Sequence, residues 1–98
     1  MSELPVLSVI VPCFNEEENI PKTTSRLIEV INDLVKNQEI SNKSFIFYVD
    51  DGSTDNTWNE ISEFAKKYPE QVKGIKFSRN FGNQKAILAG LLESYKHN

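Results

Sequence analysis

Apolar residues in this chain alternate between short continuous runs and stripes with helical spacing. Residues 7–11 and 45–49 are almost wholly apolar and rich in β-branched or aromatic side chains, which is typical of strands buried on both faces. A third run at residues 72–77 is interrupted by Lys73 and Lys76. Stripes at i, i+3 and i+4 cover residues 27–35, 58–68 and 83–96. The pattern predicts the order β-α-β-α-β-α.

This alternation predicts an α/β fold. Right-handed crossovers make the sheet parallel and cover it with helices, which gives a three-layer, Rossmann-like arrangement. Asn19 is the expected N-cap of the first helix, Asp55 or Thr57 caps the second, and Pro69 ends it. Three strands bury only a modest core. Residues 1–98 are therefore expected to be the N-terminal part of a larger domain, whose third strand exposes an edge that could pair with a second copy.

Charge and composition exclude several classes of function. The net charge of −3, without a basic cluster, argues against nucleic acid as a partner. The single cysteine, Cys13, excludes an internal disulfide and is interpreted as a buried thiol. No apolar run approaches the roughly 20 residues of a membrane span. No basic segment of a signal peptide precedes the first strand, so a cytoplasmic location is expected.

The segment that follows each strand carries the candidate chemistry. Carboxyl ends of parallel strands meet at one edge of a sheet, where ligands bind. After the first run, in VPCFNE (residues 11–16), Pro12 is expected to end the strand. Phe14 offers a wall for a planar ring. Packing beneath the first helix is an equally compatible role for Phe14.

The second and third segments add opposite charges to this edge. In VDDGSTD (residues 49–55), Asp50 and Asp51 could accept the ring N–H of uracil or guanine or a ribose hydroxyl, although such a turn can also be merely solvated. Gly52 allows close approach of the backbone, and Asp55 is interpreted as a helix cap. Residues 77–85 carry Arg79 and Lys85, which suit a pyrophosphate. Together the three segments predict a nucleotide pocket.

These three segments, in this order, resemble the inverting nucleotide-sugar glycosyltransferases of family 2, which have the GT-A fold. The resemblance extends to the branch of dolichol-phosphate and undecaprenyl-phosphate sugar transferases. It covers residues 7–92 and rests on VPCFNE, VDDGSTD and SRNFG followed by an alanine-containing helix. Phe14 stands where a tyrosine is commoner in the family.

The resemblance implies a donor site for a UDP- or GDP-sugar. Asp51 would recognise the base edge, Asp50 would support the turn or the metal region, and the other members would line the base, ribose or phosphates. The full set of expected nucleotide-binding residues is Pro12, Phe14, Asn15, Glu16, Asp50, Asp51, Gly52, Arg79 and Lys85.

One departure from the family pattern concerns the metal. The family holds Mg²⁺ or Mn²⁺ with an Asp-x-Asp motif, and no such motif occurs in these 98 residues. The metal motif, the catalytic carboxylate and the acceptor half are expected beyond Asn98, so this segment alone is expected to bind no metal and to be inactive. For the whole protein the resemblance implies a lipid-phosphate acceptor and a location at the cytoplasmic face of a membrane.

Other classes of protein fit the motifs less well. Haloacid-dehalogenase phosphatases separate their two carboxylates by one residue, whereas Asp50 and Asp51 are adjacent. Response-regulator receivers place paired acids after the first strand, where this chain has Pro12 and Phe14. A dinucleotide-binding domain needs a glycine-rich turn there, and residues 12–17 contain no glycine. A non-catalytic nucleotide-binding or interaction module is the remaining alternative.

Overall fold

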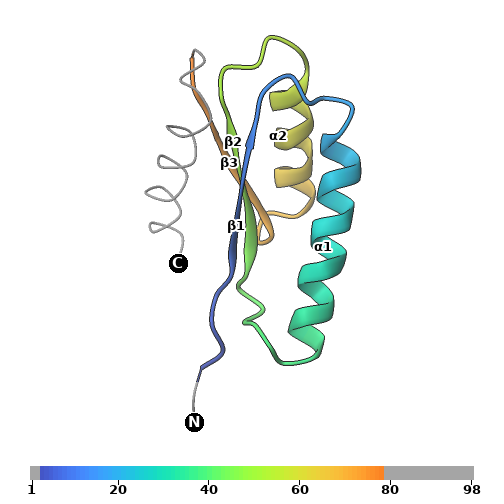
Figure 1. Ribbon diagram of the computed structural model, residues 1–98, viewed down its shortest axis with the longest axis vertical. Coiled ribbons are helices and arrows are strands. Elements are labelled where there is room, and N and C mark those ends of the chain that lie inside the picture. The colour runs from blue at the N-terminus through green and yellow to red at the C-terminus, as the bar shows by residue number, and fades with distance from the viewer. Residues whose placement is uncertain (1–2, 79–98) are drawn as a thin grey trace.

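The computed structural model describes residues 3–78, so the predicted helix at 83–96, Arg79 and Lys85 lie outside the described residues. Within that range the predicted order of elements is confirmed. The elements are β1 (Ser8–Cys13), α1 (Ile20–Lys36), β2 (Phe45–Asp50), α2 (Thr57–Lys67) and β3 (Val72–Lys76). The three strands form a parallel sheet in the order β1-β2-β3, with β2 in the middle (Figure 1).

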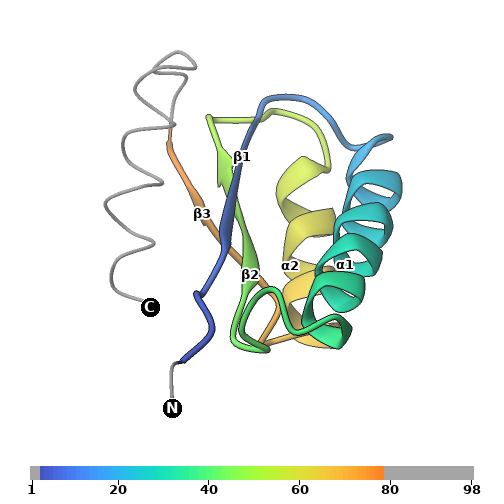
Figure 2. The same ribbon diagram turned by 60° about the horizontal axis from the view of Figure 1, so that its bottom comes forward.

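Both described helices cover the same face of the sheet (Figures 1 and 2). This follows from connectivity, because each right-handed crossover advances one strand in the same direction. The opposite face of β2 carries a second buried cluster, formed by Phe45, Phe47 and Val49. Burial on both faces of a central strand is the pattern of a sheet in a layered α/β fold. The predicted parallel α/β architecture is thus confirmed, and self-association through the outer edge of β3 stays a prediction.

The core between sheet and helices uses the apolar stripes seen in the sequence. Ile31 of α1 and Ile61 of α2 are almost fully buried against Ile46 and Tyr48 of β2. The remaining members of the two stripes pack against them and are Leu27, Ile28, Leu34, Val35, Trp58, Phe64, Ala65 and Tyr68. One polar contact crosses this core, a 2.6 Å hydrogen bond between the buried hydroxyls of Thr24 and Tyr48.

The expectation that Pro12 ends the first strand is wrong. Pro12 pairs with Val49 inside β1, and the strand continues to Cys13. The carbonyl oxygens of Leu7 and Cys13 accept hydrogen bonds from the N–H groups of Phe45 and Asp51. The backbone N–H and C=O groups of the odd-numbered residues of β1 therefore point toward β2. The nitrogen of Pro12 points to the outer edge instead, so its lack of an N–H removes no hydrogen bond to β2.

The two helix starts differ in how far they match the sequence. Asn19 is the N-cap of α1 as predicted, although its side chain donates to Glu16 Oε2 at 2.7 Å instead of accepting from the helix backbone. Asn56 occupies the N-cap position of α2, and Thr57 is its first residue. Neither predicted cap, Asp55 or Thr57, occupies the N-cap position, although Asp55 Oδ1 accepts the N–H of Thr57 at 2.9 Å from the position before it.

We expect the Thr24–Tyr48 bond to stabilise the packing of α1 on the sheet. Thr24→Val leaves a buried tyrosine hydroxyl unpaired, and Tyr48→Phe leaves the threonine hydroxyl unpaired. Each change should lower the free energy of unfolding by about 1–3 kcal/mol in urea denaturation. The double variant should lose less than the sum, because neither hydroxyl remains to be satisfied. Strictly additive losses would show that the two hydroxyls are not coupled.

Candidate functional site

Two loops meet at the carboxyl edge of the sheet, and we call residues 14–19 loop 1 and residues 51–56 loop 2 (Figure 1). They follow the neighbouring strands β1 and β2. The N–H of Asp51 donates to the carbonyl oxygen of Cys13 at 2.9 Å, which carries the sheet pairing one residue beyond the end of β2. The two loops therefore leave the sheet side by side.

Asp50 organises the turn of loop 2. Its side chain is fully buried, and Oδ1 accepts the N–H of Ser53 at 2.9 Å. Gly52 lies between them with φ of 83°, a left-handed backbone that glycine adopts without steric cost. Asp50 Oδ2 is buried and has no hydrogen-bond partner among residues 3–78. The bond from the Ser53 N–H to Asp50 is a contact through which Asp50 supports the turn.

Loop 1 is bound to loop 2 at Asn15. Asn15 has φ of 52°, an uncommon left-handed conformation that asparagine tolerates better than most residues. Its N–H donates to Ser53 Oγ at 2.9 Å, and its Oδ1 accepts the N–H of Thr54 at 2.9 Å. Asn15 is therefore joined to loop 2 by one bond in each direction, to Ser53 and from Thr54, the two residues that follow Gly52.

The next two residues of loop 1 continue this contact. The N–H of Glu16 donates to Thr57 Oγ1 at 2.8 Å, and the N–H of Glu17 donates to Asp55 Oδ2 at 3.4 Å. Thr57 Oγ1 itself donates to Asp55 Oδ1. Three successive backbone N–H groups of loop 1 are thus paired with side-chain oxygens from residues 53–57.

The structure gathers most of the predicted site residues at this edge. Those brought together by β1, β2 and the two loops are Pro12, Phe14, Asn15, Glu16, Asp50, Asp51 and Gly52. Phe14 is 41% exposed and belongs to neither apolar cluster, so it does not pack beneath α1. Asp51 is buried, with 3% of its surface exposed. Arg79 and Lys85 lie outside the described residues.

Sequence reasoning missed Ser53 and Thr57, whose hydroxyls hold loop 1. Their signal was present as polar side chains at alternate positions in Ser53-x-Asp55-x-Thr57. That pattern is also the ordinary signature of a helix start, where such side chains accept N–H groups of their own helix. The sequence could not indicate that the partners come from another loop.

The electrostatics of the site are dominated by carboxylates. Burial, together with the negative charges of Asp50, Glu16, Asp55 and Asp51, raises the pKa of the Cys13 thiol to about 12. Cys13 Sγ donates to the Val49 carbonyl at 3.6 Å, so the thiol is a buried hydrogen-bonded group, as predicted. Desolvation raises the pKa of Asp55, but hydrogen bonds from Thr57 and Glu17 outweigh it and hold that pKa below its ordinary value.

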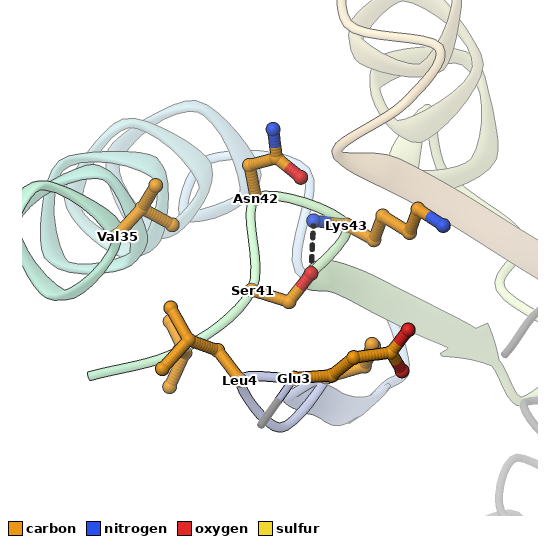
Figure 3. Close-up of a pocket in the computed structure, with 8 residues that line it drawn as sticks. Glu3, Leu4, Val35, Ser41, Asn42 and Lys43 are labelled. Carbon is orange, nitrogen blue, oxygen red and sulfur yellow. Dashed lines mark hydrogen bonds between the residues drawn. The ribbon is translucent and has the colours of Figure 1, made fainter. Parts of the chain in front are cut away.

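One cavity lies at the carboxyl edge of the sheet and another at its opposite end. The smaller, about 180 Å³, lies between the loops and is lined by Asn15, Glu16, Glu17, Glu18, Asn19 and Asp55. The larger, about 820 Å³, lies at the opposite end of the sheet between the N-terminal segment and the α1–β2 connection (Figure 3). None of the predicted site residues lines it. No three His, Cys, Asp or Glu side chains of residues 3–78 are placed to hold a metal ion, so we assign none to them.

The chain matches the family model described as Glycosyl transferase family 2 over residues 8–96. It is 47% identical over 87 residues to the uncharacterized glycosyltransferase YkoT of Bacillus subtilis, covering 89% of this chain and 26% of that protein. It is 34% identical over 84 residues to an undecaprenyl-phosphate 4-deoxy-4-formamido-L-arabinose transferase of Shewanella sediminis, covering 86% and 24%. The chain therefore spans about a quarter of the length of these relatives.

A solved structure shares the fold. The mannosyltransferase PcManGT of Pyrobaculum calidifontis, in complex with GDP-Man and Mn²⁺, superposes with a TM-score of 0.67 at 22% identity. The match covers 94% of this chain and 25% of that one. This likeness confirms the predicted fold, the N-terminal part of a GT-A domain.

We expect Cys13 to be protected from alkylation in the folded protein. Iodoacetamide reacts with thiolates, and a pKa of about 12 leaves almost none at pH 8. Because Cys13 is the only cysteine of the chain, mass spectrometry reads its modification directly. Labelling at pH 8 should be slow in buffer and fast in urea, and equal rates would contradict the buried position.

The same pKa shift predicts a loss of stability at alkaline pH. The folded-state pKa lies above the ordinary value of 9.0, so the folded state holds the thiol proton more tightly than the unfolded state does. The resulting stabilisation is complete below pH 9.0 and is lost as the pH rises toward about 12. Cys13→Ser should show a smaller decline in the free energy of unfolding over this range. An identical pH profile for the two proteins would contradict this linkage.

Proposed function

Because the chain belongs to glycosyl transferase family 2, we propose that the whole protein transfers a sugar from a nucleoside diphosphate sugar to an acceptor. In this proposal the described residues hold the base and ribose of the donor. The observation that carries it is the joined pair of loops at the carboxyl edge of the sheet. They present an exposed aromatic ring, Phe14, beside the carboxyl-bearing turn at Asp50 and Asp51.

The loops suit a base and a ribose better than a phosphate. Phosphate sites need free backbone N–H groups or cations. The N–H groups of Asn15, Glu16 and Glu17 are already paired with loop 2 and the start of α2. Loops 1 and 2 also carry five carboxylates and no lysine or arginine. The diphosphate therefore belongs elsewhere, and the proposal keeps Arg79 and Lys85 for it.

Each remaining site residue has a role suited to its chemistry. Phe14 provides a face on which a base stacks. Asp51 provides an acceptor for a ring N–H of uracil or guanine, and Gly52 allows the ligand to approach the backbone. Pro12 and Glu16 complete the wall on the side of β1 and loop 1. In this site Asn15 and Asp50 act through the turn that they hold.

We further propose a polyprenyl phosphate as the acceptor, at the cytoplasmic face of a membrane. This part draws on the relatives that are named for undecaprenyl phosphate, such as the Shewanella sediminis transferase. None of the relatives described above is named as a non-catalytic binding module. Among residues 3–78, no helix has the length and apolar character needed to traverse a bilayer.

In the proposed reaction an acceptor oxygen attacks the anomeric carbon and the nucleoside diphosphate leaves. A divalent metal, Mg²⁺ or Mn²⁺, would neutralise the charge that develops on the leaving diphosphate in the whole protein. The described residues contribute by binding: they fix one end of the donor, which orients the anomeric carbon for attack.

Substitution of Phe14 tests the base-stacking role. Phe14→Ala in the whole protein should weaken binding of UDP or GDP by roughly 5- to 150-fold, because stacking on an aromatic side chain contributes about 1–3 kcal/mol per base. Isothermal titration with both nucleotides, with and without Mn²⁺, measures the loss. Phe14→Tyr keeps the ring and should bind as the unmodified protein does.

A control on another surface separates stacking from general damage. Val30 of α1 is an exposed apolar residue, 47% exposed, and Val30→Ala should leave nucleotide binding unchanged. If neither UDP nor GDP nor their sugars bind the unmodified protein under any metal condition, the proposed function is wrong.

A further inference from the structure

We propose that Ser53, Asp55 and Thr57 are positioning residues that dock loop 1 onto loop 2 and so prepare the base-binding edge. Each accepts one of the three successive backbone N–H groups of residues 15–17. The consequence for ligand binding rests on the proposed function, whereas the docking itself does not depend on it.

The burial of two of the three acceptors makes this docking specific. Thr57 is fully buried, and Ser53 is 7% exposed, so their hydroxyls have little access to water as an alternative partner. Asp50, at the end of β2, accepts a hydrogen bond from the Ser53 N–H and so holds Ser53 in place. A chain of contacts therefore runs from the buried end of β2 through Ser53 to the backbone of Asn15. These contacts anchor loop 1 to the end of β2.

These side chains do not serve α2 in the usual way. An N-cap side chain accepts the N–H of the second or third residue of its own helix, and Asn56 at the N-cap of α2 makes no such bond. Asp55 accepts the N–H of the first helical residue and also that of Glu17. Ser53 and Thr57 direct their acceptor oxygens to loop 1. Ser53 and Thr57 thus accept from loop 1, whereas Asp55 binds both the first residue of α2 and loop 1.

The docking controls where Phe14 lies. Phe14 precedes Asn15, whose left-handed backbone is held by the bonds to Ser53 and Thr54. Without them, loop 1 can relax to commoner backbone conformations, and the fraction of molecules with the ring at the site falls. Apparent affinity for the nucleotide falls in proportion to that fraction.

The test compares two buried threonines of the whole protein. Thr57→Val removes the hydroxyl that binds loop 1 and keeps the shape of the side chain. Thr24→Val is the matched control, because Thr24 is also fully buried and hydrogen-bonded, but to Tyr48 in the core. Amide hydrogen exchange of loop 1 and titration with UDP and GDP are measured for both. Thr57→Ser, which keeps the hydroxyl, serves as the rescue.

In Thr57→Val we expect amide exchange in residues 15–17 to rise about tenfold, the equivalent of one lost hydrogen bond. Nucleotide affinity should fall by a similar factor. Thr24→Val should change neither readout, and Thr57→Ser should restore both. Ser53→Ala, a smaller change, should reproduce the effect through Asn15 and replaces Thr57→Val if that variant does not fold.

Equal effects of Thr57→Val and Thr24→Val would overturn the proposal, because they would indicate only general destabilisation. Unchanged exchange in loop 1 of Thr57→Val and Ser53→Ala would overturn it as well. If the unmodified protein binds neither nucleotide, the proposed function fails, and the exchange measurement still decides whether these residues dock loop 1.

Discussion

Parallel pairing of β1 with β2 is the constraint on which the site depends. The pairing places Cys13 opposite Asp50, and the bond from the Asp51 N–H to the Cys13 carbonyl extends it to the roots of both loops. A slip of one residue would move every side chain of β2 to the other face of the sheet. Asp50 would then leave the helix side, and the turn that it holds through Ser53 would lose its support.

Much of the fold follows from the apolar pattern alone. The runs at residues 45–49 and 72–77 and the stripe at residues 58–68 lie close to the observed bounds of β2, β3 and α2. α1 begins at Ile20, well before its stripe at residues 27–35, at the start that Asn19 indicates. Pro12 is the instructive error. Whether a proline ends a strand depends on which edge of the strand its nitrogen faces. The pairing of β1 with β2, which is distant in sequence, decides that edge. The residues next to Pro12 in the sequence do not indicate which edge its nitrogen faces.

The part of the candidate site that could be predicted is the part that strand topology alone determines. Ends of adjacent parallel strands share an edge, so the motifs around Phe14 and Asp51 had to meet. The left-handed backbone of Asn15 and the partners of Ser53 and Thr57 depend on how two loops face each other across a few ångströms. A hydroxyl at a helix start looks the same in the sequence whether its partner lies in that helix or in a neighbouring loop.

The reciprocal bonds between loops 1 and 2 also limit how this site can diversify. An inserted or deleted residue in either loop would shift Asn15 against Ser53 and separate several donors from their acceptors at once. Changes of side chain at Phe14 leave those backbone contacts in place. Variation at this edge is thus confined to the identity of exposed side chains such as Phe14, while the lengths of the two loops are coupled to each other.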